Sequence, residues 1–290
     1  ELLVYDLQHL LADRYRPLTR NSLPTQSQQE SSSVKINGGL YMMGYSGDQF
    51  CYDIELPEHK VYLDDYKIDS YPVSNKQYMK FVDDGGYDDF KYWLSDGWDK
   101  VRNENWKAPM YWEKIDGQWM TCDFLGKRKI NPNEPVCHVS YYEADAYCKW
   151  AGKRLPTEAE WEKAACWDEK NQRKTIFPWG NESPDPIHAN LLESYLWNCS
   201  EIGAYPDGKS HYGCHQMIGD VWEWTSTEFF GYPGFKTGFS EYNDKWFANQ
   251  KVLRGGSFGT PSISIRGSYR NFFRLDERWL FSGFRCAEYI

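Results

Sequence analysis

The sequence predicts an α+β domain with few regular elements and long ordered loops. Short alternating runs such as His59-Lys60-Val61-Tyr62-Leu63 are typical of strands. A hydroxyl residue followed three positions later by Gln or Glu indicates a capped helix start, and this pattern occurs at Ser74, Ser140 and Thr157. After residue 170, Pro, Gly, Asn and aromatic residues dominate, so the strands there must be short.

The chain divides into three predicted parts. Residues 1–20 are predicted to be the C-terminal helix of an upstream helical domain, because four leucines between residues 3 and 11 share one helix face. A helix of this length is not stable alone, so it must pack on something. Residues 21–33 are polar and lack core-forming side chains, which predicts a linker or a disordered loop. Residues 34–290 are predicted to form one domain.

Two of the capped starts predict well-defined helices. The helix after Ser140 should cover about residues 141–150 and stop near Gly152. The helix after Thr157 should cover about residues 158–166, and the two glutamates near its start suit the helix dipole.

The composition is unusual in its aromatic content. The 290 residues are enough for one large domain or two modest ones, and they include 14 Trp, 22 Tyr and 15 Phe. Each ring buries a large area, so a substantial core can form from few regular elements. Packing is the ordinary use of such rings, and a ligand pocket lined by some of them is the alternative.

Charge and cysteine usage exclude several classes of protein. A formal net charge of −9 without a Lys/Arg run argues against a nucleic-acid surface. No apolar run approaches the ~20 residues that span a membrane, and no signal-peptide pattern opens the chain. The eight scattered cysteines form no CxxC, so we expect reduced thiols in a cytoplasmic protein. Because the chain begins with Glu rather than Met, we expect a segment to precede it.

Four motifs occur in a distinctive order in the second half of the chain. They are Gly152-Lys153-Arg154-Leu155-Pro156-Thr157-Glu158-Ala159-Glu160-Trp161-Glu162, Gly219-Asp220-Val221-Trp222-Glu223-Trp224-Thr225, Val252-Leu253-Arg254-Gly255-Gly256-Ser257-Phe258 and Gly283-Phe284-Arg285-Cys286-Ala287. Together they resemble the formylglycine-generating-enzyme/sulfatase-modifying-factor domain, a large relative of the C-type lectin fold, over roughly residues 34–290. The resemblance implies a C-type-lectin-like fold, and this fold hosts several activities.

The formylglycine-generating chemistry is not expected here. That family places two cysteines after its Gly-Gly-Ser, and the corresponding positions are Thr260 and Ile265. A copper-thiolate oxidase needs soft sulfur ligands, which these residues cannot provide.

A second set of motifs is more specific. It covers residues 57–64, 71–75, 84–87, 93–98, 109–112, 116–119, 135–140, 231–235 and 269–272. These motifs resemble the iron-dependent sulfoxide synthases of ergothioneine and ovothiol biosynthesis, in which a DinB-type helical bundle precedes the same domain. The resemblance implies Fe(II), O2, hercynine, and either cysteine or γ-glutamylcysteine as substrates. It also implies that the chain begins just after the third iron histidine, because Glu1-Leu2-Leu3 resembles the end of an iron-binding His-x3-His-x-Glu segment.

The histidines of the chain itself do not indicate an iron site. His211 and His215 are four apart but flank a glycine in a turn, so they are read as loop or surface residues. We therefore expect the iron ligands, which must leave positions open for oxygen and substrate, to lie upstream of this chain.

The resemblance places a substrate pocket at an Arg-Asn pair followed by aromatic residues. These are Arg270, Asn271, Phe272 and Phe273. The rings could enclose a quaternary ammonium group, which aromatic faces bind well, while Asn271 hydrogen-bonds the carboxylate. The alternative is that both phenylalanines are core residues and Asn271 caps a turn.

The resemblance also implies a catalytic tyrosine that steers oxidation toward the sulfoxide. Tyr232 is the first candidate and Tyr242 the second. The alternative for Tyr232 is an aromatic turn residue packed by Pro233.

Two positions depart from the pattern of relatives that use γ-glutamylcysteine. Phe273 and Glu277 stand where those relatives carry Asp and Arg. Arg274 and Arg278 could hold a carboxylate instead, since a guanidinium binds it with two parallel hydrogen bonds. This favours cysteine as the thiol, although ordinary surface ion pairs would explain both arginines equally well.

A structural calcium ion is a further expectation from the resemblance. Its oxygen ligands would come from Gln216, Gly219, Val221 and Glu223, as calcium requires. The alternative is that Glu223 pairs with an arginine.

Two other functions compete with the sulfoxide synthase. A non-catalytic C-type-lectin-like binding module would share the Trp-Glu-Trp and Gly-Gly-Ser motifs but would not need the Asn271 pocket. An ovothiol-type synthase would act on histidine rather than hercynine.

Overall fold

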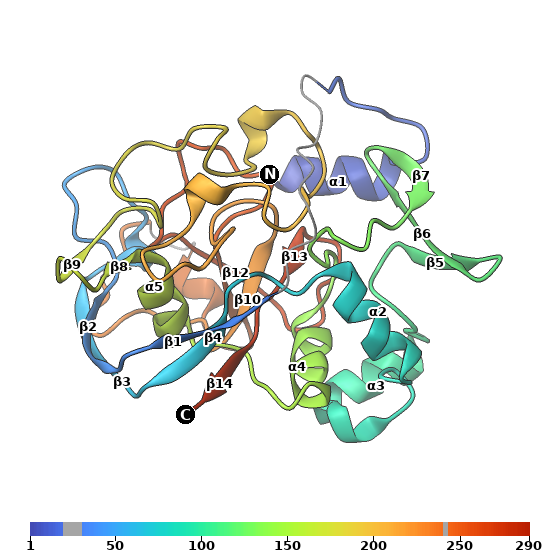
Figure 1. The fold of residues 1–290 in the computed structure, drawn as a ribbon, viewed down its shortest axis with the longest axis horizontal. Helices are drawn as coiled ribbons and strands as arrows, with labels where there is room; N and C mark the ends of the chain where they lie inside the picture. Colours follow the sequence, from blue (N-terminus) through green and yellow to red (C-terminus); the bar gives the residue numbers. More distant parts are fainter. Residues whose placement is uncertain (20–30, 240–242) are drawn as a thin grey trace.

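The computed structural model describes residues 1–19, 31–239 and 243–290 (Figure 1). The predicted linker therefore lies mostly outside the described residues, as does Tyr242. Strand β1 begins at Ser33, within one residue of the predicted start of the domain.

Five α-helices occur in the described residues. Their bounds are Leu2–Leu11 for α1, Asn75–Asp83 for α2, Ser95–Asn103 for α3, Tyr141–Trp150 for α4 and Glu158–Cys166 for α5. The three predicted capping boxes are confirmed, because the hydroxyls of Ser74, Ser140 and Thr157 each accept a hydrogen bond from the backbone three residues on. The helix α3 was not predicted; its N-cap residue is Leu94, which makes no side-chain cap.

The strands form small sheets, as the sequence indicates. A four-stranded sheet has the order β12-β11-β10-β13, and a three-stranded sheet has the order β1-β4-β14. The bounds of the first sheet are Arg270–Phe273, Lys251–Arg254, Trp222–Glu228 and Ser282–Gly283. Those of the second are Ser33–Ile36, Tyr66–Asp69 and Ala287–Tyr289.

Three hairpin-like units complete the strand set. They are β2 (Gly39–Met43) with β3 (His59–Leu63), β5 (Trp112–Ile115) with β6 (Gln118–Asp123) and β7 (Gly126–Lys129), and β8 (Trp167–Asp168) with β9 (Arg173–Lys174). The predicted strand at residues 59–63 is thus confirmed as β3.

The core of the domain contains two large hydrophobic clusters. One includes Trp222 and Trp224 of β10 with residues of α2 and α4, and the other includes Trp161 of α5 with residues of β2 and β3. Figure 1 shows α2, α3 and α4 gathered at one side of the molecule and α5 at the other. All three tryptophans are fully buried, so the aromatic richness of the chain serves packing to a large extent.

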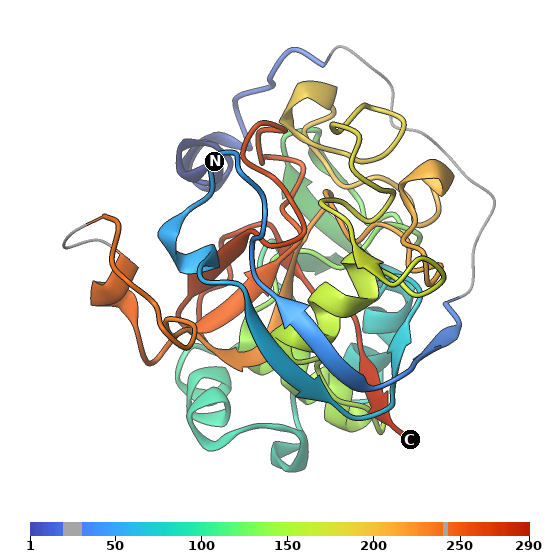
Figure 2. The same ribbon diagram turned by 90° about the vertical axis from the view of Figure 1, so that its left-hand side faces the viewer.

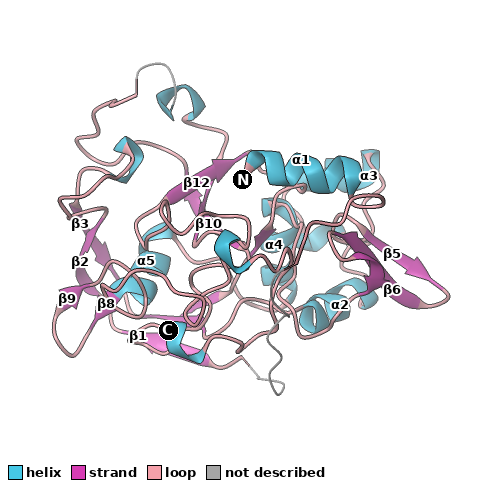
Figure 3. Ribbon diagram, turned by 90° about the horizontal axis from the view of Figure 1, so that it is seen from above, coloured by secondary structure: helices cyan, strands magenta, loops and turns pink. Residues whose placement is uncertain are grey.

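Helix α1 packs on the domain through a face that includes Leu7 of the predicted leucine stripe but not Leu3 or Leu10. Tyr5 and Gln8 are buried, whereas Leu3 and Leu10 are each 69% exposed. The reason is that Tyr5 packs edge-on against Phe281, at 4.6 Å between ring centroids, and finds a hydrogen-bond partner that no leucine could use. In Figure 3 the N-terminal end of α1 lies beside β12. No described helix is long and apolar enough to cross a membrane.

Candidate functional site

A pocket of about 460 Å³ lies between the N-terminal end of α1 and strand β12. Its walls are largely aromatic, with a few polar and charged groups. The lining residues are Glu1, Leu2, Tyr5, Trp246, Gln250, Tyr269, Asn271, Phe272, Phe273, Arg274, Glu277 and Trp279. Trp246 belongs to the short helix Asn243–Trp246, and Figure 2 shows this segment standing out from the body of the domain.

Strand β12 supplies one wall of the pocket. It pairs antiparallel with β11, so that Asn271 lies opposite Leu253. The Oδ1 atom of Asn271 accepts a hydrogen bond from the backbone N–H of Phe272 at 2.9 Å. Within the described part of the chain, its Nδ2 atom has no hydrogen-bond partner, so it can donate to a ligand.

The phenylalanines of β12 have different surroundings. Phe272 stacks on Phe229 at 3.9 Å between centroids, with an interplanar angle of 10°, and joins a small core cluster. Phe273 meets Trp279 edge-on at 5.3 Å. Phe272 is therefore partly a core residue, as the alternative interpretation has it, and Phe273 belongs with the aromatic wall.

The arginines near β12 separate into two groups. Arg274 is exposed and lines the pocket. Arg270 is buried, and its guanidinium donates to Glu158 at 2.7 and 3.1 Å and to the carbonyl of Ile54. Arg278 donates to Glu143 at 3.0 and 2.8 Å. Arg270 and Arg278 are thus committed to internal ion pairs and do not line the pocket.

Tyr232 lies in the buried charged cluster rather than in the pocket. Its hydroxyl donates to Glu158 at 3.2 Å, and the Arg270 guanidinium lies 4.1 Å from its ring centroid. Burial raises the pKa of Tyr232 well above its usual value. These contacts favour a structural role for Tyr232.

The same cluster continues through Arg254. This residue is fully buried and donates to Glu158 at 2.7 Å and to Glu162 at 2.5 Å. Burial alone would raise the pKa of Glu162, but Lys174 and Arg254 outweigh that effect and lower it to about 2. Each charge is therefore paired and hydrogen-bonded, as buried charges must be.

The four residues proposed to bind calcium make hydrogen bonds within the protein. Glu223 makes two hydrogen bonds of 2.7 Å with Arg285 and accepts a third from Trp161. The Gln216 side chain accepts from the N–H of Gly203 and donates to Asp220. Gly219 and Val221 bond each other through their backbones. These contacts favour the alternative interpretation, in which Glu223 pairs with Arg285.

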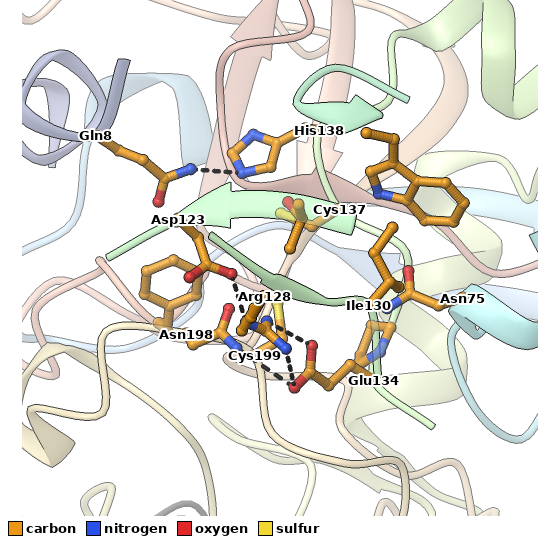
Figure 4. A pocket seen from close by; sticks show the side chains of 14 residues that line it. Gln8, Asn75, Asp123, Arg128, Ile130, Glu134, Cys137, His138, Asn198 and Cys199 are labelled. Carbon is orange, nitrogen blue, oxygen red and sulfur yellow. Dashed lines mark hydrogen bonds and ion pairs between the residues drawn. The ribbon is translucent and has the colours of Figure 1, made fainter. Parts of the chain in front are cut away.

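A second, smaller cavity of about 30 Å³ lies where α1 meets β6 and β7 (Figure 4). Gln8 and His138 meet there at 2.8 Å between nitrogens, and Arg128 pairs with Asp123 and Glu134. Burial raises the pKa of Glu134 to about 7. The cavity has room for about one water molecule, so it does not compete with the larger pocket as a substrate site.

Comparison with known proteins settles the family. The family described as "Sulfatase-modifying factor enzyme 1-like domain" matches residues 19–290. The chain belongs to this family.

The chain is similar both to a hercynine oxygenase and to a formylglycine-generating enzyme. The chain is 39% identical to the hercynine oxygenase of Mycolicibacterium smegmatis over 88% of its own length, and it spans 61% of that relative. It is 31% identical to the formylglycine-generating enzyme of Mus musculus, covering 88% of this chain and 74% of the relative. The structure of PvdO from Pseudomonas aeruginosa has a TM-score of 0.62 at 20% identity, covering 92% of this chain and all of that one, which shows the shared fold alone.

The two positions that hold cysteines in formylglycine-generating enzymes have other uses in this member of the family. The Thr260 hydroxyl donates to Glu1 at 3.0 Å. Ile265 is a buried core residue. Neither can supply a sulfur ligand.

The described residues also contain no group of three or more His, Cys, Asp or Glu side chains that could hold a metal ion. His215 stacks on Tyr71 at 4.6 Å, and His211 lies 3.8 Å from Asp168. These two histidines therefore do not fit an iron centre.

Sequence reasoning missed much of the pocket wall. Tyr5, Trp246, Gln250 and Trp279 lie outside the motifs that carry the resemblance, and Tyr269 lies in the 269–272 motif but was not predicted to line the pocket. The high aromatic content was the one signal that pointed to such a wall.

Proposed function

We propose that this chain is the substrate-binding part of a non-haem Fe(II), O2-dependent sulfoxide synthase. The reaction would join the imidazole of hercynine to the sulfur of cysteine or γ-glutamylcysteine. The pocket formed by α1 and β12 carries this proposal, together with the similarity to a hercynine oxygenase.

The pocket chemistry suits a betaine. Hercynine carries a trimethylammonium group, which cannot donate a hydrogen bond but is attracted by aromatic faces. Tyr269, Phe273 and Trp279 line the pocket and are partly exposed, so their rings can offer such faces. The free amide of Asn271 and the guanidinium of Arg274 can both donate to the neighbouring carboxylate. The same aromatic wall favours hercynine over unmethylated histidine, which the ovothiol-type alternative would require.

The iron would be held by a segment that precedes Glu1. Once bound, it would supply the activation of oxygen. Glu1 and Leu2 line the pocket, so a segment that precedes Glu1 would join α1 beside the pocket. The outer face of α1 can receive that segment, because Leu3 and Leu10 are each 69% exposed.

Cysteine is the preferred thiol in this proposal. Phe273 and Glu277 do not offer the charges that would bind a longer thiol, and Arg278 is engaged by Glu143. Arg274 is left as the cationic group of the pocket wall.

The catalytic tyrosine is best sought at Tyr242. Tyr232 donates to Glu158 away from the pocket, whereas Tyr242 precedes the pocket residue Trp246 by four positions. A matched pair of variants separates them. Tyr242→Phe should shift the product from sulfoxide toward cysteine sulfinic acid, and Tyr232→Phe should leave the product ratio unchanged. The opposite pattern would return the role to Tyr232.

The decisive test uses the full-length protein loaded with Fe(II) under anaerobic conditions. Hercynine, then cysteine or γ-glutamylcysteine, and then O2 are added, and the products are identified by mass. We expect a sulfoxide, and Asn271→Ala should reduce its formation while the exposed Asn103→Ala should not. Hercynine binding without any oxidised product would favour the binding module, and neither binding nor turnover would overturn the proposal.

A further inference from the structure

The side chain of Glu1 ends in a carboxylate site built by three separate parts of the chain. Its Oε1 atom accepts hydrogen bonds from the Tyr5 hydroxyl at 2.7 Å, the Trp222 indole N–H at 2.8 Å and the Ser257 hydroxyl at 2.5 Å. Its Oε2 atom accepts from the Thr260 hydroxyl at 3.0 Å. All four donors are no more than 1% exposed, so this is an enclosed site rather than a surface contact.

The loop that carries Ser257 and Thr260 directs their hydroxyl protons toward Glu1. The Ser257 oxygen accepts from the N–H of Gly259 at 3.1 Å, and the Thr260 oxygen accepts from the N–H of Ser257 at 2.9 Å. A hydroxyl has one proton and can accept at its lone pairs. Because the backbone already uses an acceptor position on each oxygen, the protons remain to be donated to the carboxylate.

The Gly-Gly-Ser motif makes this loop possible. Gly255 and Gly256 have φ values of 96° and 75°, which residues with a side chain rarely adopt. A Cβ atom on Gly256 would lie 3.3 Å from the Thr260 hydroxyl oxygen and 2.8 Å from Ile265. The two glycines therefore allow the loop to fold back so that both hydroxyls face the same carboxylate.

The site has no cation of its own among the four donors. A carboxylate in such surroundings is stabilised by charge-assisted hydrogen bonds, each stronger than a neutral one. Burial and the neighbouring Glu1 raise the pKa of Tyr5 well above its usual value, so Tyr5 remains a proton donor at neutral pH. Four neutral donors around two oxygens are what a single carboxylate requires.

The carboxylate site is continuous with the large pocket. Glu1, Leu2 and Tyr5 line that pocket, and Tyr5 packs against the pocket residue Trp279 at 5.5 Å between centroids. Trp222 in turn packs edge-on against the pocket residue Tyr269 at 5.5 Å. A shift of Glu1 would therefore move two aromatic walls of the pocket.

We propose that Trp222, Ser257 and Thr260, closed by Tyr5, form a monocarboxylate-binding site whose resident ligand is the side chain of Glu1. Glu1 is a positioning residue: its carboxylate fixes the N-terminal end of α1, and with it the α1 wall of the pocket. The effect on turnover rests on the proposed function, whereas the carboxylate site stands without it.

The test is chemical rescue in the full-length protein. Glu1→Gly removes the resident carboxylate and leaves a space of about the size of that carboxylate group. We expect the melting temperature to fall and the KM for hercynine to rise by roughly tenfold or more, as for the loss of hydrogen bonds to a charged group. Acetate should restore both in part, and acetamide, a neutral molecule of nearly the same shape, should not.

Matched variants keep the test decisive. Glu182→Gln, an exposed carboxylate far from the site in sequence, should melt as the wild type does. If Glu1→Gly does not fold, Thr260→Val removes one donor with little change in volume. It should lower the melting temperature and raise the KM by smaller amounts, and Thr260→Ser should restore the wild-type values. Equal effects of acetate and acetamide, or a Thr260→Val variant identical to the wild type, would overturn the proposal.

The melting measurements separate this inference from the proposed function. If the wild-type protein forms no sulfoxide but acetate still raises the melting temperature of Glu1→Gly, the proposed function fails and the carboxylate site stands. If the wild type is active and acetate has no effect on Glu1→Gly, the carboxylate site fails alone.

Discussion

Arg270 and Arg274 are four residues apart, yet they belong to opposite environments. Arg270 is 2% exposed and paired with Glu158, whereas Arg274 is exposed at the wall of the pocket. The first holds the fold together, and the second is available to a ligand. A residue type therefore indicates which interactions are possible. Its burial and its neighbours decide whether the side chain forms an internal ion pair or can contact a substrate.

Removing Arg270 should produce the largest effect. Arg270→Met leaves Glu158 buried with one of its two arginine partners missing, and breaking such a pair costs about 3–5 kcal/mol. The free energy of unfolding in urea would show this loss. Arg274→Met is the matched control, since an exposed substitution usually changes stability by no more than about 0.5 kcal/mol. Equal stability of the two variants would remove the distinction between these arginines.

In substrate binding, the exposed Arg274 should matter. Arg274→Met should raise the KM for the carboxylate-bearing substrate about 10–100-fold, because a hydrogen bond to a charged group contributes about 1.5–3 kcal/mol. Initial rates of the full-length, iron-loaded protein would measure it. An unchanged KM, with melting as in the wild type, would mean that Arg274 does not contact the substrate.

Asp220 offers a second comparison with Glu158. It is also a buried carboxylate, but the donors of its hydrogen bonds do not include an arginine. It accepts hydrogen bonds from Asn190, Ser200 and Gln216, all of them neutral donors. Burial raises the pKa of Asp220 to about 6. The folded protein then keeps a proton that the unfolded chain releases near pH 4, so this group makes stability fall as the pH rises from about 4 to 6.

Asp220→Asn should abolish that part of the pH dependence. The difference in unfolding free energy between the variant and the wild type should change by up to about 3 kcal/mol between pH 4 and 7, in favour of the variant at the higher pH. Urea unfolding at a series of pH values provides the measurement. A difference that does not vary with pH would show that Asp220 titrates as it does in the unfolded chain.

The smallest expected effect concerns cysteine reactivity. Burial would raise the pKa of Cys137, but a hydrogen bond from Cys199 and the nearby His138 lower it to about 6. Burial raises the pKa of Cys51 and of Cys122. Iodoacetamide at pH 7 should therefore alkylate Cys137 before Cys51 and Cys122, which peptide mass spectrometry can follow. Earlier modification of Cys51 or Cys122 would contradict these surroundings.

Local signals in the sequence predicted local structure well. The capping boxes at Ser140 and Thr157 gave α4 and α5 with their observed bounds, because a cap depends on residues within one helical turn. The Trp-Glu-Trp and Gly-Gly-Ser motifs indicated the fold for a similar reason, since each sits at a specific structural position.

The roles of single site residues were harder to predict, because they depend on distant partners. Arg270 is paired with a glutamate 112 positions away in sequence, and the same Glu158 holds Tyr232. No spacing reveals such contacts. Asn271 and Phe273 were found because the resemblance carried them, whereas Tyr5 and Trp279 reach the pocket from segments that the motifs do not cover.

A crystal structure of the full-length protein with hercynine bound would test the central claim most directly. We expect the trimethylammonium group to lie against Tyr269, Phe273 and Trp279, with the carboxylate near the Asn271 amide and Arg274. Hercynine bound elsewhere, with this pocket left empty, would contradict it.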